Sequence, residues 1–586
     1  MSETATPGGA LDAPHAPHEV AGFLLLAVLS AALVAPSWDA PFSGRDDNRF
    51  VVNNPVVKGE KTVYEALFYN ELELYQPAVL LAHRFERQML TDVFKVRDEH
   101  LFAYWAPFSR IMGGLFHLLA GLALWHGVLP KLNVRGAAAL LVTAIFLVHP
   151  LQCENLCWIA ERKSILAGFF MACTLALYLQ ARLREPAAPA PGGPSGDLPW
   201  DGVALASWLG VGVLYALALA SKISAAGLIP LLAAWEMLLG PQRLFGSDLR
   251  ARLHEPREFL GRMARIALPL GLLVLLSLPF LRENWHAAEK GLGFRLGGSW
   301  FGTLLGDVEI VARYLLLAAC PWNLSTYYAV VAPASPFDAA FLGYAALLAG
   351  ALGVSLWLPA SEERRRFACF GWAWFFGAMV TYLNLVPNSE YMHDRYLYFS
   401  LPGLGLVLVE CARGLHARLG GRVAARTGWF AALGLAVLWA ALGARTAGFW
   451  QSDIHVFRRA AEAQPDCSFA HGYLGLSLGV IANQRASLGK PEDLEQARVW
   501  REEALAALRR AGECPDIETN LRRVQYMVAQ AVILKAMGRM DEVRRQIDFL
   551  QAETLRRGWT TPRDLDFARY SRLLLEPPAP PPPPEE

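Results

Sequence analysis

Long apolar runs alternate with short polar connections along most of the chain. Eleven runs approach the length of about 20 residues that a helix needs to cross a bilayer. They lie near 20–37, 110–128, 137–151, 164–181, 202–220, 225–240, 264–281, 337–359, 368–386, 399–415 and 428–446. A twelfth run, 301–320, contains Asp307, Glu309 and Arg313 and predicts an amphipathic or re-entrant helix. The pattern predicts an all-α, polytopic membrane protein with about eleven transmembrane helices.

The pattern changes after residue 446. Within 469–515 and 519–553, apolar residues recur three or four apart, which predicts two pairs of amphipathic helices. Gly489, Lys490 and Pro491 separate the helices of the first pair. The pairs resemble degenerate tetratricopeptide (TPR) repeats, which stack into a concave peptide-binding surface. A plain helical bundle explains the same pattern equally well.

These patterns divide the chain into four parts. We expect a disordered N-terminus over 1–19, a membrane domain over 20–446 and a TPR-like helical domain over 447–570. The Pro-rich tail 571–586 is expected to be disordered, as is the Pro/Gly/Ala segment 186–198.

Arginine-rich connections predict the orientation in the membrane, because cytoplasmic loops carry an excess of Lys and Arg. With eleven spans, five such connections fall on one side: 129–136, 182–201, 241–263, 360–367 and 412–427. The N-terminus is then cytoplasmic, and the C-terminal domain is extracytoplasmic.

Composition agrees with a membrane protein and excludes some partners. Hydrophobic residues make up 54% of the chain and charged residues 18%, which is apolar for a soluble protein. The net charge of +1 gives no bulk attraction to nucleic acid. The eight cysteines form no CxxC…CxxC metal pattern, although Cys467 and Cys514 lie in the same soluble region and could pair.

With this orientation, nearly all of the unusual polar residues face the extracytoplasmic side. They come from five separate connections, and a random scatter of loop charges would not be so one-sided. The residues are Asp46, Asp47, Glu154, Arg162, Lys163, Lys222, His393, Asp394 and Arg395.

Seven stretches in a fixed order resemble one family. They are "DDNRFVVNNPVV", "YQPAVLLAHRF", "FHLLAGLALW", "AIFLVHPLQCENLCWIAERKSILAGFFMACTLALYL", "ASKISAAGLIPLLAAWEML", "RYLLLAACPWNLSTYY" and "NLVPNSEYMHDRYLYFSLPGLGLVL". Together they resemble the transmembrane-and-tetratricopeptide O-mannosyltransferases and their bacterial relatives, over roughly residues 40–485. The family usually has an acidic residue directly after the matched lysine, Lys222, where this chain has Ile223.

The resemblance implies a GT-C glycosyltransferase, in a bacterial inner membrane, that uses a polyprenyl-phosphate-linked sugar such as mannose. Its acceptor would be a hydroxyl of a protein Ser or Thr, or of a glycan, with the TPR-like domain available to dock a protein. Metal dependence stays open, with a divalent ion conceivable and no ligand set evident. A membrane scaffold or transporter is the alternative, but such proteins place charges near the bilayer midplane and often show paired halves.

The resemblance also implies roles for the outer-face residues. An acidic residue after the first span acts as general base, and we choose Asp47 narrowly over Asp46, with Glu154 as a second acidic element of the site. The residues expected to bind the donor phosphate are Arg395, Lys222, Arg162 and His393.

Each of these residues also has a plainer explanation. On residue type alone, the Asp pair is a turn or a helix N-cap at the membrane surface, and Glu154 with Arg162, eight residues on, is a surface pair. Lys222 at the end of a span is also placed to extend its ammonium toward the membrane surface.

Overall fold

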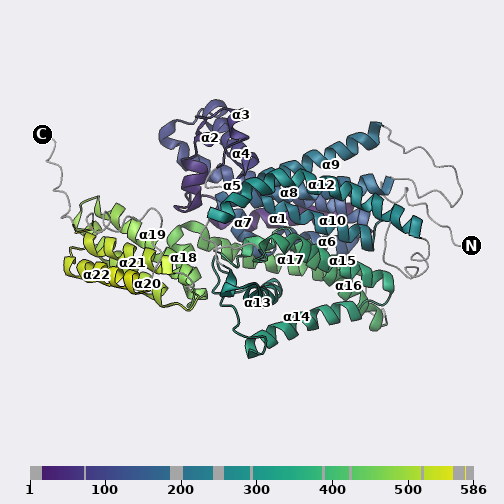
Figure 1. Ribbon diagram of the computed structural model, residues 1–586. Helices are drawn as coiled ribbons and strands as arrows, with labels where there is room; N and C mark the ends of the chain where they lie inside the picture. The colour runs from purple at the N-terminus through teal and green to yellow at the C-terminus, as the bar shows by residue number, and fades with distance from the viewer. Residues whose placement is uncertain are drawn as a thin grey trace, which may run out of the picture. The chain divides into compact units, whose positions relative to one another are not determined.

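The computed structural model describes residues 16–70, 74–184, 202–241, 256–290, 295–385, 390–420, 425–516, 520–557 and 574–575. The regular structure in these ranges is helical, with no β-strand (Figure 1). The chain divides into two units. The first comprises Met1–Leu324 and Ala332–Gln451, and the second comprises Ser325–Val331 and Ser452–Glu586. Apart from 16–19 and 574–575, the segments expected to be disordered lie outside the described residues.

Each of the eleven apolar runs coincides with a helix of the first unit. The helices are α1 (Pro17–Val34), α5 (Asp98–Leu122), α6 (Gly136–Leu147), α8 (Arg162–Arg184), α9 (Gly202–Ser221), α10 (Leu228–Leu238), α12 (Pro256–Lys290), α14 (Ala339–Trp357), α15 (Glu362–Met379), α16 (Leu401–Arg418) and α17 (Ala425–Ala447). Within the described residues, eight helical stretches are long and apolar enough to cross a membrane. The all-α polytopic fold is confirmed, and the number of spans stays a prediction.

Burial separates the central helices from those on the rim. The spans that contain α6 and α8 are 78% and 67% buried within the protein, whereas the α14 span is only 6% buried. An apolar helix that leaves most of its surface uncovered suits contact with lipid. The central position of α8 matters because the candidate site is built around its N-terminus.

Short helices between α1 and α5 form a small cap with its own apolar core. They are η2 (Asn48–Val52), α2 (Pro55–Lys58), α3 (Val63–Ala66), α4 (Pro77–Gln88) and η3 (Met89–Val93). Their buried side chains, Val56 and Leu80 among them, pack with Trp105 of α5 and with Ile159. The cap is thereby fixed to the segment just before α8.

The twelfth apolar run forms a single helix, α13 (Trp300–Ala319). Trp300 and Phe301 on it are more than half exposed, whereas Asp307 and Tyr314 are buried. The helix therefore buries Asp307 and Tyr314 among apolar residues such as Ile310, and exposes further apolar side chains.

One expected cytoplasmic charge lies inside the helix bundle instead. The Arg182 guanidinium binds the buried Glu236 of α10, with Nη2 3.0 Å from Oε2, and Tyr178 donates a 2.7 Å hydrogen bond to the same carboxylate. The assignment of Arg182 to the connection 182–201 is therefore wrong, because α8 continues to Arg184. Lys131 and Arg135 remain as basic residues of the connection 129–136, whereas Arg184 is the last residue of α8.

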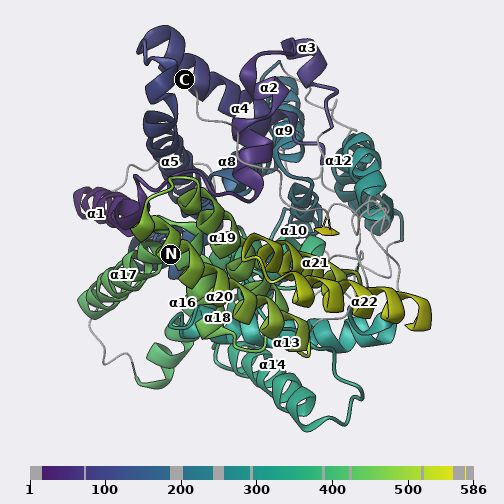
Figure 2. The same ribbon diagram turned by 90° about the vertical axis from the view of Figure 1, so that its left-hand side faces the viewer.

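The second unit contains the four helices expected from the sequence, preceded by α18 (Asp453–Ala463). They are α19 (Ser468–Ala486), α20 (Pro491–Glu513), α21 (Asn520–Ala536) and α22 (Met540–Arg557), and α20, α21 and α22 lie side by side (Figure 2). Gly489 lies in the turn between α19 and α20 and has a φ of +74°, a backbone conformation that favours glycine. Tyr327, from the segment Ser325–Val331, stacks on Phe469 and Tyr473 of α19. Cys467 and Cys514 are both buried free thiols.

Candidate functional site

A break in the helix before α8 creates the site. The short helix α7 (Cys153–Cys157) ends at Trp158, whose extended backbone (φ −91°, ψ 114°) leads into the 3-10 turn Ile159–Glu161. Glu154 and Arg162 therefore do not lie on one continuous helix. The expectation that their eight-residue spacing places them on one face is wrong, because the chain changes direction between them.

Glu154 and Arg395 form the centre of the site. Glu154 accepts hydrogen bonds from the Arg395 backbone N–H at 2.9 Å and from its Nη1 at 2.6 Å. Both side chains are buried. Burial opposes the charge of Arg395, but Glu154, Tyr396 and Glu390 raise its pKa well above the ordinary value. The guanidinium is thus a permanent buried cation held by carboxylates.

Glu161, which the sequence analysis did not select, connects the other cations. It accepts a 2.6 Å hydrogen bond from Ser164 and lies 3.1 Å from Lys222 Nζ, 3.2 Å from Lys163 Nζ and 3.3 Å from Arg395 Nε. Lys222 also donates to Ser164 at 2.8 Å. Burial lowers the pKa of Lys222, but Glu161 and Tyr382 raise it more, so the ammonium stays charged.

Glu390 completes the cluster. It lies 2.6 Å from Arg395 Nη2, 3.1 Å from His393 Nε2 and 3.8 Å from Arg45 Nη2. Burial alone would raise the pKa of Glu390, but His393, Arg395 and Arg45 hold it well below its ordinary value. His393 Nδ1 also lies 3.8 Å from Glu154.

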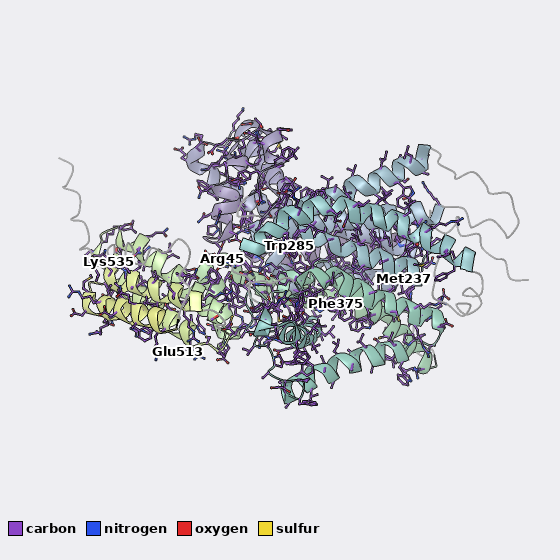
Figure 3. The ribbon with its side chains drawn as sticks, in the orientation of Figure 1. Arg45, Met237, Trp285, Phe375, Glu513 and Lys535 are labelled. Carbon is purple, nitrogen blue, oxygen red and sulfur yellow. The ribbon has the colours of Figure 1, made fainter. Side chains whose placement is uncertain are left out.

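The Trp158 indole lies among three of the cations. The Arg45 guanidinium is 4.4 Å from the ring centroid, that of Arg395 is 5.3 Å away, and Lys163 Nζ is 5.9 Å away (Arg45 is labelled in Figure 3). An aromatic face attracts cations and keeps them close without neutralising them. Four cations (Arg45, Lys163, Lys222 and Arg395) thus gather around three carboxylates (Glu154, Glu161 and Glu390).

The two adjacent aspartates differ sharply. Asp47 is buried, and its carboxylate accepts the Ser43 N–H at 2.8 Å and the Ala160 N–H at 2.7 Å. It therefore fixes the turn that carries Glu161. Asp46 is half-buried, and within the described part of the chain it has no hydrogen bond or ion pair. Of the pair, Asp46 is the carboxylate with lone pairs available for a proton.

Arg162 belongs to a separate buried cluster. Its Nη1 lies 2.5 Å from Glu86 Oε1, and Nη2 donates to the Ser109 backbone carbonyl. Burial would raise the pKa of Glu86, but Arg162 and His83 with their hydrogen bonds lower it to about 2. The pair joins α4 of the cap to α8. Arg162 thus pairs with a carboxylate outside the site.

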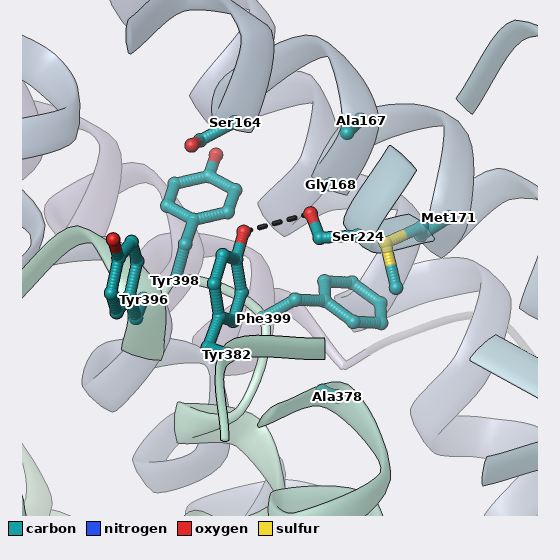
Figure 4. A pocket seen from close by; sticks show the side chains of 10 residues that line it. All are labelled: Ser164, Ala167, Gly168, Met171, Ser224, Ala378, Tyr382, Tyr396, Tyr398 and Phe399. Carbon is teal, nitrogen blue, oxygen red and sulfur yellow. Dashed lines mark hydrogen bonds between the residues drawn. The ribbon is translucent and has the colours of Figure 1, made fainter. Parts of the chain in front are cut away.

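A pocket adjoins the cationic cluster, which is the group of Arg45, Lys163, Lys222 and Arg395 with their carboxylates Glu154, Glu161 and Glu390. It is a small, partly open pocket lined mainly by aromatic and small side chains (Figure 4). Tyr382 and Tyr396 stack with ring centroids 4.3 Å apart, and Tyr382 donates a 2.7 Å hydrogen bond to Ser224. The other lining residues are Ser164, Ala167, Gly168, Met171, Ala378, Tyr398 and Phe399.

Two contacts join the pocket to the cations. Ser164, in the pocket wall, binds both Glu161 and Lys222, and Lys222 Nζ lies 5.3 Å from the centroid of the Tyr382 ring. Lys222 therefore lies just beyond the pocket, whose own lining residues carry no charge.

The donor set does not fit a divalent metal ion. Within the described ranges, no group of three His, Cys, Asp or Glu side chains is placed to hold one. The carboxylates Glu154, Glu161 and Glu390 already face Arg or Lys, and Asp47 faces backbone N–H groups. Their lone pairs are thus directed at protein donors, and no step of the chemistry below is routed through a metal.

The structure thus brings Glu154, Lys222, His393 and Arg395 together and holds Asp47 against the same turn. Sequence reasoning gave no site role to Arg45, Glu161, Lys163 and Glu390, although it placed Lys163 on the outer face. A signal was present for two of them, since "AERK" places Glu161 and Lys163 at the boundary of a long apolar run. Arg45 and Glu390 carry no such signal, because their role depends on contacts between distant segments.

Comparison with known proteins gives likeness only in structure. No protein-family model and no curated protein matches the chain. Among similar solved structures is the oligosaccharyltransferase AglB from Archaeoglobus fulgidus in complex with an inhibitory peptide and a dolichol-phosphate. It is 13% identical with a TM-score of 0.41, over 74% of this chain and 56% of that one. The chain thus spans little more than half of that protein.

A second similar structure is ArnT from Cupriavidus metallidurans bound to undecaprenyl phosphate. It is 15% identical with a TM-score of 0.35, over 96% of this chain and 85% of that one. Both TM-scores are below 0.5, so the function has to be argued from the residues of the site itself.

Proposed function

We propose that the first unit is a glycosyltransferase that moves a sugar, mannose or a similar hexose, from a polyprenyl-phosphate donor to a hydroxyl acceptor at the outer membrane face. The observation that supports it is the group of cations around Arg395, of which Lys222 lies beside an aromatic pocket. Arg and Lys hold phosphate through charge-assisted hydrogen bonds, and aromatic rings suit the apolar faces of a sugar or a lipid chain.

The reaction follows from the placement of charge. The acceptor oxygen attacks the anomeric carbon of the donor, and the bond between that carbon and the phosphate oxygen breaks. A single displacement of this kind inverts the anomeric centre. Arg395 and Lys222 stabilise the negative charge that develops on the departing phosphate. Because Glu154 and Glu161 fix these cations beforehand, little reorganisation is needed during the reaction.

The proton of the acceptor needs a base, and the geometry favours Asp46 over our initial choice, Asp47. A base needs a lone pair directed at the reacting hydroxyl. Both oxygens of Asp47 accept backbone N–H groups. Asp46 directly follows Arg45, which lies beside Glu390 and Trp158 in the cluster. Asp47 acts as a positioning residue for the Glu161 turn.

The acceptor in this proposal is a protein Ser or Thr, docked on the TPR-like second unit, and the membrane is the inner membrane of a bacterium.

The test compares Asp46→Asn with Asp47→Asn in nanodiscs, using undecaprenyl-phosphate mannose as donor and a Ser/Thr-containing peptide as acceptor. Asp46→Asn should lower turnover by two to four orders of magnitude, roughly the contribution of a general base, and leave donor binding within about twofold. Asp47→Asn should instead lower the melting temperature, since it replaces a buried acceptor with an amide. Asp98→Asn, an exposed carboxylate at the start of α5, is the matched control and should change neither property.

Full turnover by Asp46→Asn would refute the assignment of the base. A wild-type chain that binds no polyprenyl phosphate would refute the glycosyltransferase itself and favour the scaffold or transporter alternative.

A further inference from the structure

Two buried oxygen atoms near the site lack hydrogen-bond partners. Asp307 of α13 and Asn384, just after the 3-10 turn Val380–Tyr382, are 7% and 2% exposed. Asp307 Oδ1 accepts the Asn384 backbone N–H at 3.2 Å and its side-chain Nδ2 at 2.9 Å. Among the described residues, Asp307 Oδ2 and Asn384 Oδ1 have no partner. A buried acceptor without a donor is energetically unfavourable, so a donor is expected there.

The pair lies against the segment that carries the cationic cluster. Asn384 follows Tyr382 of the pocket wall by two residues, and its Nδ2 lies 3.5 Å from the Tyr391 carbonyl. About two helical turns further along α13, the Tyr314 hydroxyl accepts the His393 N–H at 3.0 Å and donates to the His393 carbonyl at 2.9 Å. Asp307 and Asn384 are thus tied to the backbone between the aromatic pocket and Arg395.

The chemistry of the missing partner follows from the atoms. Asp307 Oδ2 and Asn384 Oδ1 are both hydrogen-bond acceptors, so a partner must supply hydrogen-bond donors. Asp307 has no cation partner among the described residues, and burial raises its pKa while the Asn384 hydrogen bonds lower it, leaving it raised. A calcium ion takes six to eight oxygen ligands, far more than the two orphans. Two hydroxyl groups of one sugar ring supply two donors at close spacing.

We propose that Asp307 and Asn384 form a sugar-recognition subsite that accepts hydrogen bonds from hydroxyl groups of the hexose on the lipid donor. The inference rests on the proposed function and extends it, since the cations bind the phosphate that all polyprenyl-phosphate donors share. Asp307 and Asn384 then select donors that carry a sugar over the bare lipid phosphate. A site built to bind a hydroxyl discriminates strongly against a ligand that lacks it.

The test measures the affinity of two lipids, undecaprenyl-phosphate mannose and undecaprenyl phosphate, for the full chain in nanodiscs. Asp307→Asn should weaken binding of the mannosyl lipid about tenfold or more, as expected for a hydrogen bond to a charged group. Binding of the bare phosphate should stay within about twofold. Glu309→Gln is the matched control, because Glu309 lies on the same helix and pairs with Arg313 instead. It should leave both affinities unchanged.

The outcomes separate the two proposals. An equal loss for both lipids, or no loss for the mannosyl lipid, overturns the sugar subsite, and the orphan oxygens then bind water only. If thermal unfolding shows that Asp307→Asn does not fold, Asn384→Ser decides by the same ratio of affinities. A wild-type chain that binds neither lipid overturns the proposed function and the subsite with it.

Discussion

At the scale of single residues, the chain separates charges that gather in the candidate site from charges that support the fold. Arg395 and Arg162 are both buried beside carboxylates and close to the same helix break. Arg395 shares its three carboxylates with Arg45, Lys163, Lys222 and His393. Arg162 instead faces one carboxylate, Glu86, which neutralises it. The difference lies in the neighbours, because the residue type is the same.

The Arg162 assignment can be tested by Arg162→Met. Leaving Glu86 buried without its partner should destabilise the protein by about 3–5 kcal/mol, the usual effect of breaking a buried pair. Thermal unfolding in nanodiscs measures this loss. The folded fraction should still bind undecaprenyl phosphate within about twofold of wild type, whereas Arg395→Ala should bind it about tenfold more weakly or worse.

The double variant Glu86→Gln/Arg162→Met is the control, and it should recover part of the lost stability because no uncompensated charge remains. If Arg162→Met kept its stability but lost phosphate binding, Arg162 would belong to the phosphate site, as the sequence first suggested.

At the scale of elements, close packing of helices places the pocket wall. α15 and α16 approach at Gly371 and Gly403, where a Cβ on Gly403 would come within 2.5 Å of the Gly371 carbonyl oxygen. Small residues allow helix backbones in membranes to approach in this way. α16 begins at Leu401, just after Tyr398 and Phe399, so the contact also positions these two rings.

Gly403→Ala should therefore impair both stability and donor binding. The added methyl has no room, and overpacking of this kind costs roughly 1–3 kcal/mol. α16 must shift, and the aromatic wall shifts with it. Thermal unfolding and the affinity for undecaprenyl-phosphate mannose should both fall relative to Gly350→Ala, since a Cβ at Gly350 meets open space. Equal behaviour of the two variants would show that this helix contact does not control the pocket.

At the scale of the whole molecule, the orientation in the membrane stays a prediction that can be measured. The cationic cluster draws Arg45, Glu161, Lys222 and Arg395 from four distant segments, so all four must lie on the same side of the membrane. The arginine-rich connections place that side outside the cytoplasm.

Alkaline phosphatase, which is active only outside the cytoplasm, should be active when fused after Gln451 and inactive when inserted in the connection 360–367. The reverse pattern would place the site on the cytoplasmic face and exclude an outer-face donor.

The sequence by itself determined the helical, polytopic fold and the paired helices of the second unit. Apolar runs of bilayer length and three-to-four spacing are local patterns, and the solvent around each segment decides them largely independently of the others. Every one of the eleven runs became a helix, and Gly489 falls at the break between α19 and α20. The chemical types of the site residues were also visible as charges beside apolar runs.

Only the tertiary structure decided which charges act together. The break at Trp158 turned Arg162 away from Glu154, and Asp47 became the acceptor that fixes this break. Glu161 joined Lys222 across 61 residues, and Glu390 joined Arg45 across a still longer stretch of chain. Such pairings depend on how helices pack, and a buried charge is held in place only by partners that packing brings to it. Spacing along the chain therefore could not predict them.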